Sequence, residues 1–230
     1  MREIVWDTET TGFDPDGGDR LVEIGAVELQ NHMPTGRIFH QYINPERDMP
    51  QGAFEVHGLS EEFLKDYPVF KKIGQAFLDF VGDAVLIAHN ANFDMKFINA
   101  ELKWATLPQF TSNRALDTLE IARRKFPGAQ NSLDALCRRF GVDNSGREKH
   151  GALLDSELLA EVYLELIGGR QPDLTLDIVA GSDVATKQAN DVVIEARANP
   201  LPARLTDEER GAHQKFVESF GADGPWKGYR

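Results

Sequence analysis

Acidic residues near the start of the chain have the types and the spacing of a metal site. Asp7 and Glu9 end a short apolar run, and in a strand the residues i and i+2 point to the same face. Two neighbouring carboxylates repel each other unless a cation lies between them, and a hard divalent metal ion is the natural cation. For this pair alone, a polar strand end that faces water is the alternative.

Two further carboxylates fall on predicted helices. Asp94 lies in the opening turn of a helix predicted at 92–104, directly after an apolar strand at 84–88. Asp155 is followed by apolar residues at the spacing of a helical stripe, which puts its carboxylate on the apolar face of a helix predicted at 153–166. A buried charge must be paired or bind a metal, because burying it alone is costly. An aspartate that caps a neighbouring loop is the alternative.

A histidine close to this helix has the chemistry of a general base. His150 lies five residues before Asp155, and five helical residues turn through about 500°, so the two side chains do not share a helix face. We therefore expect His150 on the loop before the helix. An imidazole there suits the removal of a proton from a metal-bound water. A surface histidine is the alternative.

Strands and helices that position these groups can be read from the hydrophobic pattern. Apolar or alternating runs predict strands at 3–6, 21–29 and 37–43, joined as an antiparallel meander by turns at 12–18 and 31–36. Helical periodicity then predicts helices at 70–81, 92–104, 119–125, 133–140 and 153–166. A meander followed by alternating strands and helices implies an α/β fold with a mixed sheet flanked by helices.

The charge of the chain is unevenly distributed. Its 230 residues include 25 Lys and Arg and 37 Asp and Glu, a formal net charge of -12. Residues 187–230 hold seven basic and seven acidic residues, so the whole negative excess lies in residues 1–186. Such a surface repels nucleic acid unless cations or a partner intervene, which favours a local metal-filled site over broad DNA binding.

Composition excludes two classes of protein. A hydrophobic content of 41% with 14 Phe does not fit a disordered chain, and the apolar runs are too short for a membrane protein. The first residues lack the apolar core of a signal peptide, and the single cysteine, Cys137, cannot form an internal disulfide. We therefore expect a cytoplasmic protein.

The sequence changes character after residue 169. Residues 170–186 are rich in turn formers and predict a linker, and Thr206 with Glu209 predicts a capping box that begins a helix ending near Phe220. The apolar stripe of this helix is thin. We expect the segment 187–230 to be a flexible tail that either drapes on the domain or orders on a partner.

Four blocks of sequence together resemble the DEDDh 3′–5′ exonuclease family. They are DTETTG at 7–12, HNANFD at 89–94, NSLDALC at 131–137 and HGALLD at 150–155. Within that family the chain most resembles the proofreading (epsilon) subunits of bacterial DNA polymerase III, over residues from about 2 to 169. One departure is Asn92, where the family often has an apolar residue or proline.

The resemblance implies an RNase H-like fold with a mixed five-stranded sheet, and hydrolysis of the terminal phosphodiester by a two-metal mechanism. Two Mg²⁺ or Mn²⁺ ions would be held by Asp7, Glu9, Asp94 and Asp155, and His150 would take the proton of the attacking water. The 3′-terminal nucleotide would be met by Asp7, Thr8, Glu9, Thr10, Thr11, Gly12, His57 and Asp155. For His57 a role in capping a loop is the alternative, and Asp117 is interpreted as a helix N-cap or a support behind the metal ligands.

The resemblance also implies three functional segments. Residues 1–169 would be the exonuclease domain, 170–186 a linker, and 187–230 a tail that binds the catalytic (alpha) subunit of the polymerase. In the linker, Gln171, Leu174 and Leu176 resemble a peptide with which bacterial replication factors dock on the sliding clamp (beta). In the tail, Phe216, Phe220 and Trp226 would be the anchors.

These observations predict a metal-dependent 3′–5′ exonuclease that edits the primer terminus for a replicative DNA polymerase. Only a frayed single-stranded end of the DNA need enter its site, which favours mismatches because unpairing them costs less free energy. One alternative is a relative that trims RNA or free single strands. Another is an adaptor between polymerase and clamp with a vestigial nuclease domain, and the five intact catalytic positions argue against it.

Overall fold

The computed structural model describes residues 1–146, 149–168 and 206–219. Contacts group the chain into two units, Met1–Thr175 and Leu176–Arg230, and each is considered by itself. The described part of the second unit is helix α8 (Asp207–Glu218), which begins with the predicted capping box of Thr206 and Glu209. The following predicted residues lie outside the described residues: Gln171, Leu174, Leu176, Phe220 and Trp226.

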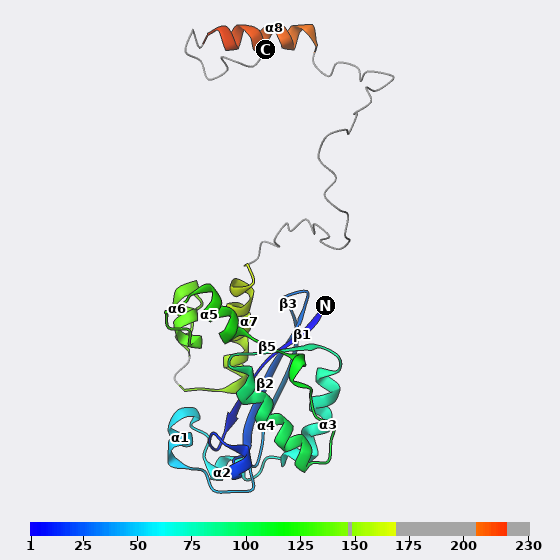
Figure 1. Ribbon diagram of the computed structural model, residues 1–230, viewed down its shortest axis with the longest axis vertical. Coiled ribbons are helices and arrows are strands. Elements are labelled where there is room, and N and C mark those ends of the chain that lie inside the picture. Colours follow the sequence, from blue (N-terminus) through cyan, green and yellow to red (C-terminus); the bar gives the residue numbers. More distant parts are fainter. Residues whose placement is uncertain (147–148, 169–205, 220–230) are drawn as a thin grey trace, which may run out of the picture. The chain divides into compact units, whose positions relative to one another are not determined.

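The first unit is built on a five-stranded mixed sheet of order β3-β2-β1-β4-β5 (Figure 1). The antiparallel meander predicted for the first strands is present as β1 (Arg2–Thr10), β2 (Leu21–Gln30) and β3 (Met33–Tyr42). The short strands β4 (Val85–Ala88) and β5 (Ala115–Asp117) run parallel to β1. The prediction of a mixed five-stranded sheet is therefore confirmed.

Helices cover both faces of this sheet (Figure 1). Helices α3 (Phe70–Val81) and α4 (Ala91–Trp104) pack on one face, against alternate side chains of β1 such as Ile4 and Trp6. Helix α7 (Ala152–Leu166) packs on the other face, where Val5 and Val27 contact it. Helices α5 (Thr118–Lys125) and α6 (Leu133–Phe140) pack beside α7 and bury Cys137.

Strand β1 is longer than the sequence predicted, and this changes where its acidic residues lie. The apolar run ends at Trp6, but β2 continues to pair with β1, with Asp7 opposite Gly25 and Glu9 opposite Glu23. On its other side β1 pairs with β4 only as far as Val5. Asp7 and Glu9 therefore lie inside the sheet but on a stretch of β1 that is open towards the end of β4.

The predicted turn at 31–36 is too long. The structure turns at Asn31 and His32 alone, with φ of 50° and 66°, and β3 already begins at Met33. Pro34 fits in β3 because this strand is at the edge of the sheet, where a missing backbone N–H leaves no neighbour unpaired.

Several short elements were not predicted. Helix α1 (Gln51–His57) buries only His57 and helix α2 (Glu61–Leu64) buries only Leu64, so neither has the periodic apolar pattern by which a helix is recognised. Two 3₁₀ turns, at Pro15–Gly17 and Ser112–Arg114, were also missed. In the part of the chain that the structure describes, no helix combines the length and the apolar character needed to cross a bilayer.

Candidate active site

A cavity of about 290 Å³ at the C-terminal ends of β1 and β4 brings together every residue predicted to be catalytic. Its lining includes Asp7, Glu9, Asp94, His150 and Asp155. These residues are far apart in the sequence, and they come from β1, from the first turn of α4, from the first turn of α7 and from the loop before α7. The fold therefore gathers the predicted set in one place.

One side of the cavity is the interface between β1 and α7. Asp7 and Glu9 continue the series of alternate β1 residues that faces α7, after Val5 in the core beneath that helix. Asp155 is 3% exposed, as its place on the apolar face of α7 predicted. Ligand atoms of Glu9, His150 and Asp155 all lie within 4.8 Å of one another.

Asp94 reaches the cavity from the helix on the opposite face of the sheet. After β4 the backbone of Asn90 adopts a left-handed conformation, with φ of 71°, and starts α4 so that Asp94 lies in its first turn. The carboxyl is 2% exposed, and Thr8 Oγ1 donates a hydrogen bond to its Oδ1 at 2.7 Å. Burial raises the pKa of Asp94 to about 7, although the hydrogen bond from Thr8 acts in the other direction.

His150 lies on the loop before α7, as predicted, and is about half exposed. Its Nδ1 is 3.3 Å from Asp155 Oδ2. The loop is held against α1: the backbone N–H of His150 donates to Val56 O at 3.3 Å, and Lys149 Nζ lies 5.3 Å from the centre of the Phe54 ring. The unpredicted helix α1 thus supports the predicted general base.

A second cavity, of about 590 Å³, adjoins the first and shares Thr8, Glu9 and Phe93 with it. Its lining includes Thr10, Thr11, Gly12 and His57, which were predicted to meet the terminal nucleotide, together with other residues of α1. The volume is in the range of small-molecule sites, about 300–1,000 Å³. The predicted substrate residues are therefore assembled beside the predicted catalytic ones.

The structure shows the loop-capping role considered for His57 and also places its ring on the larger cavity. Its Nδ1 accepts a hydrogen bond from the backbone N–H of Leu59 at 3.0 Å, which caps the loop after α1. The same ring lines the larger cavity, and its Nε2 is buried without a hydrogen bond of good geometry among the described residues. Burial lowers the pKa of His57, which favours the neutral imidazole.

Gly12 and Asp117 have structural roles that are independent of any ligand. A Cβ atom on Gly12 would lie 2.3 Å from Asp19 Oδ2, so a side chain at this position would require Asp19 to move. Asp117 is the N-cap of α5: its Oδ1 accepts from the backbone N–H of Leu119 at 2.8 Å, and from that of Asn90 at 3.0 Å. The N-cap interpretation of Asp117 is confirmed, and Asp117 also fixes the turn that leads into α4.

Several polar residues near the carboxylates, among them Asp134 in the lining of the smaller cavity, were not predicted as part of the site. His89 lines the smaller cavity, and its Nε2 lies 2.8 Å from Asn131 O. Its place directly after the buried strand, at the same sheet edge as Asp94, was the available signal. Glu23 lies opposite Glu9 on β2 and is 3% exposed, and its signal was an acidic residue near the start of a largely apolar strand.

The donors in the smaller cavity fit hard divalent cations. The four predicted carboxylates converge there from both faces of the sheet, Asp134 also lines the cavity, and oxygen ligands of this kind suit Mg²⁺ and Mn²⁺. Burial also disfavours the charged form of Asp94 until a positive charge lies beside it. The residues present therefore agree with the metal site that the sequence predicted.

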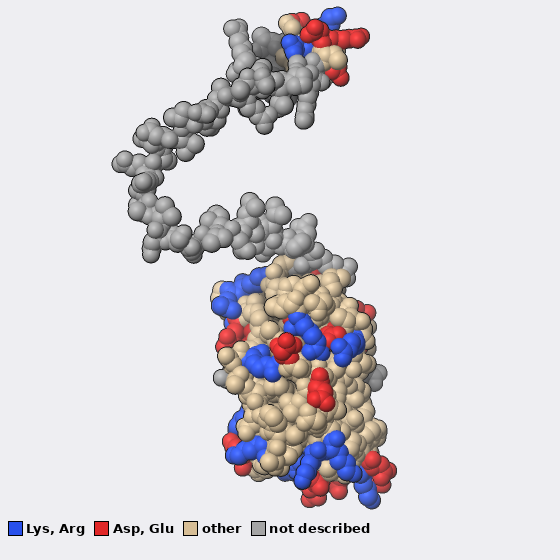
Figure 2. Space-filling model, turned by 90° about the vertical axis from the view of Figure 1, so that its right-hand side faces the viewer, with Lys and Arg blue, Asp and Glu red and all other residues tan. Residues whose placement is uncertain are grey.

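Figure 2 shows one face of the molecule, and on this face the described residues form no large patch of a single charge. Lys and Arg side chains are interspersed there with Asp and Glu, so this face offers no broad basic area to nucleic acid.

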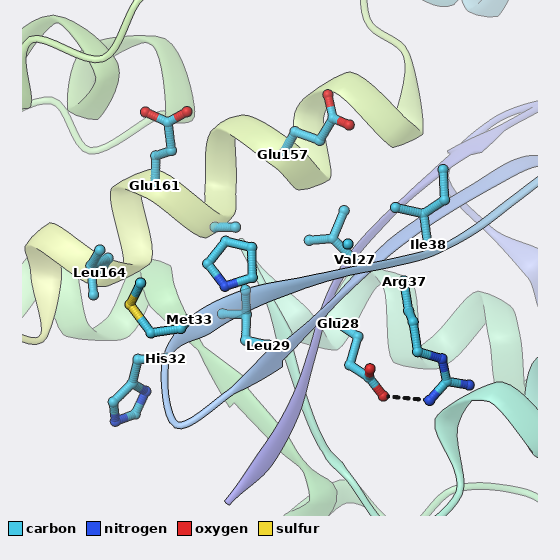
Figure 3. A pocket seen from close by; sticks show the side chains of 13 residues that line it. Val27, Glu28, Leu29, His32, Met33, Arg37, Ile38, Glu157, Glu161 and Leu164 are labelled. Atoms are coloured by element: carbon cyan, nitrogen blue, oxygen red, sulfur yellow. Dashed lines mark hydrogen bonds and ion pairs between the residues drawn. The ribbon is translucent and has the colours of Figure 1, made fainter.

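A further cavity, of about 440 Å³, lies between the β2–β3 hairpin and α7, where Glu28 pairs with Arg37 (Figure 3).

Known proteins resemble both the sequence and the fold of this chain. An exonuclease family model matches residues 4–163. A DNA polymerase III subunit epsilon of Rickettsia felis is 52% identical over 225 residues, which cover 96% of this chain and 97% of that protein. The protein of the same name from Escherichia coli K12 is 41% identical over 237 residues, which cover 98% and 97%.

Solved structures of exonucleases share the fold. The nuclease domain of 3′hExo, a DEDDh family member bound to rAMP, has a TM-score of 0.63 at 20% identity and covers 72% of this chain and 91% of its own. Exonuclease X in complex with 5′ overhanging duplex DNA has a TM-score of 0.53 at 22% identity, with 72% and 90% covered. From its sequence relatives and the exonuclease model, this chain belongs to the family of DNA polymerase III epsilon subunits, which are exonucleases.

Proposed function

We propose that this chain is the 3′–5′ exonuclease that proofreads the primer terminus for a bacterial DNA polymerase III. The observation that carries the proposal is the meeting of Asp7, Glu9, Asp94, Asp155 and His150 in one cavity. Families of nucleases that cleave phosphodiesters use such carboxylate sets to hold divalent metal ions.

In this proposal the four carboxylates hold two Mg²⁺ or Mn²⁺ ions, which would lower the pKa of the attacking water and stabilise the leaving oxygen. His150 accepts the proton of that water, and its partial exposure lets it pass the proton on to solvent. Lys149 and the N–H of His150 keep the loop on α1, so the imidazole stays close to Asp155. Thr8 orients Asp94 through the hydrogen bond to its Oδ1.

The adjoining cavity takes the 3′-terminal nucleotide. Residues 8–12 and His57 line it, and the lowered pKa of His57 favours a neutral ring against the nucleotide. A base must leave its duplex to enter a cavity of this size. Mispaired termini fray at lower cost, which gives the preference for mismatches that proofreading requires.

We also propose the polymerase III contacts that the sequence predicted. The linker 170–186 would dock on the sliding clamp through Gln171, Leu174 and Leu176, and the tail 187–230 would bind the alpha subunit. In the described part of the tail, α8 carries Phe216, one of the proposed anchors, which is 61% exposed. Deletion of 187–230 should abolish alpha binding, and Gln171→Ala should weaken clamp binding, with nuclease activity retained in both.

A nuclease assay tests the catalytic proposal. Release of 3′-terminal nucleotides is measured in Mg²⁺ from matched and mismatched DNA primers, and from an RNA primer, for the wild type, Asp155→Ala and His150→Ala. We expect faster release from the mismatched DNA, no release by Asp155→Ala, and a loss of about 10²–10⁴-fold in His150→Ala. Release from RNA alone would support the RNA-trimming alternative, and no release by the wild type would support the adaptor.

A further inference from the structure

Glu23 is a buried carboxylate that none of these steps uses. It lies on β2 and faces α7, because alternate residues of the strand, Gly25 and Val27, also contact that helix. In the register of the sheet it stands directly opposite Glu9. Like charges opposite each other on neighbouring strands are destabilising, so a second carboxylate beside the proposed metal ligand needs a reason.

The first turn of α7 helps to explain why a carboxylate is buried at position 23. The N-cap position of this helix is Gly151, which has no side chain to accept hydrogen bonds from the free amides of the first turn. Glu23 reaches across from β2, and its Oε2 accepts a hydrogen bond from the backbone N–H of Ala152 at 3.2 Å. Glu23 therefore supplies from the sheet the cap that the helix itself lacks.

Two other contacts bring the same turn onto β2. A Cβ atom on Gly25 would lie 2.2 Å from the backbone of Ala152 and Leu153, so the absence of a side chain lets α7 approach the strand this closely. Ser156 Oγ donates to Gly25 O at 2.9 Å. The turn that carries Asp155 is thus placed by the backbone and one side chain of β2.

His40 fixes Glu23 from the other side. Its Nε2 lies 2.7 Å from Glu23 Oε1, and it comes from the edge strand β3. Both oxygens of Glu23 are then engaged, one by His40 and one by Ala152. A chain of contacts therefore runs from the edge of the sheet to the helix that carries Asp155.

We propose that Glu23, held by His40, is a positioning residue that sets the first turn of α7 and so places Asp155 and His150 for catalysis. The inference rests on the proposed nuclease function for its kinetic test. What matters in it is the reach of the Glu23 side chain to Ala152 N–H, rather than its charge.

Glu28 is a matched control on the same strand. It is 5% exposed and paired with Arg2 and Arg37, so it resembles Glu23 in being buried and held by side chains of other segments. It faces the opposite side of the sheet, however, and Figure 3 shows it directed towards Arg37 while Val27 points towards α7. A general loss of stability would affect variants of both residues.

The experiment compares Glu23→Gln and Glu23→Asp with Glu28→Gln and Glu28→Asp in the full-length chain. Steady-state kinetics on a single-stranded DNA oligonucleotide in Mg²⁺ give kcat and KM. Hydrogen–deuterium exchange of the metal-free proteins, read on peptides covering residues 149–157, reports the protection of the first turn of α7 without requiring activity.

Glu23→Gln keeps an oxygen at the same reach, so we expect kcat within about threefold of the wild type and unchanged exchange. Glu23→Asp keeps the charge but is one methylene shorter, so we expect kcat to fall by about 10–100-fold, because a displacement near 1 Å can have that effect. KM should stay within about twofold, since the substrate cavity is untouched, and exchange at 149–157 should accelerate. In both Glu28 variants, kcat and the rate of hydrogen exchange at residues 149–157 should equal those of the wild type.

Three outcomes would overturn the inference. The first is full activity in Glu23→Asp with a loss in Glu23→Gln, which would mean that charge matters and reach does not. The second is unchanged exchange at 149–157 in Glu23→Asp, and the third is an equal kinetic loss in the Glu28 variants. If the wild type releases no nucleotide, the proposed function fails, and the exchange measurement alone then decides whether Glu23 holds α7.

Discussion

The buried carboxylates at the two ends of the interface between β1 and α7 have different surroundings. At one end Glu3 is fully buried, and it accepts hydrogen bonds from Tyr163 Oη at 2.8 Å and from the backbone N–H of His32 at 3.0 Å. At the other end Glu9 and Asp155 are gathered together, with ligand atoms within 4.8 Å of each other and of His150.

This difference separates a carboxylate that holds the fold from carboxylates that do chemistry. A buried anion that is surrounded by donors has its charge compensated by the protein. Carboxylates that are brought close to one another create a negative site whose compensation comes from a bound cation. The same strand and the same helix therefore stabilise one end and hold a functional site at the other.

The largest expected difference between the ends is in activity. Glu9→Gln should lower kcat/KM for 3′-nucleotide release by about 10³-fold, because it removes a ligand that the metal ions need. Glu3→Gln should stay within about threefold at a temperature where the variant is folded. Steady-state assays of both variants on one primer measure this, and equal losses would remove the distinction between the ends.

Stabilisation of the folded protein by a metal ion should depend on the carboxylates at the Asp155 end of the interface and not on those at the Glu3 end. At about 100 times its Kd, a divalent cation that binds the folded state should raise the free energy of unfolding by about 2.7 kcal/mol. Urea denaturation with and without Mn²⁺ measures this increment. Asp155→Asn should lose most of it, whereas Tyr163→Phe should retain it, and retention of the full increment in Asp155→Asn would place the cation elsewhere.

Removing a donor from Glu3 should destabilise the protein without affecting catalysis. Tyr163→Phe leaves the buried carboxylate without the hydroxyl hydrogen bond, so we expect a loss of about 2 kcal/mol in the free energy of unfolding. Burial and Glu3 raise the pKa of Tyr163, so in the wild type stability should fall as the pH rises above about 10, where the unfolded chain begins to ionise this tyrosine. Denaturation at pH 7 and 10.5 should show that Tyr163→Phe removes this part of the alkaline loss.

The smallest expected effect is an increase in the free energy of unfolding, and it comes from a substitution at the catalytic end. Asp94 ionises at about 3.8 in a model peptide and at about 7 in the folded protein, so the metal-free protein loses stability as the pH rises through this interval. Asp94→Asn keeps the oxygen that accepts from Thr8 and removes the buried charge. We expect it to stabilise the metal-free protein by about 1–2 kcal/mol at pH 8 and much less at pH 4. Thermal unfolding in EDTA at both pH values checks this, and destabilisation at pH 8 would contradict it.

Local patterns in the sequence predicted much of the fold. The helices at 70–81 and 133–140 were predicted with the bounds they have, and the helix at 153–166 within one residue. The same periodicity placed Asp155 on an apolar helix face and His150 before the helix. These predictions succeed because helical spacing and caps depend on residues that are close together in the chain.

Other features depend on contacts that no local pattern contains. Strand β1 extends to Thr10 because β2 pairs with it, and α1 meets the His150 loop through the carbonyl of Val56, far away in the sequence. The two roles of His57 could not be separated from sequence, since one imidazole nitrogen caps a loop while the ring lines a cavity.

The sequence by itself determined which groups could bind a metal ion or accept a proton and on which helices and strands they lie, because residue type and periodicity are local properties. A two-metal nuclease was what the family resemblance implied. The tertiary structure alone decided that these groups meet, that α1 supports His150, and that Glu23 caps α7. The bond from Ala152 to Glu23 joins residues 129 positions apart, and such a contact exists only once the sheet and the helix have packed together.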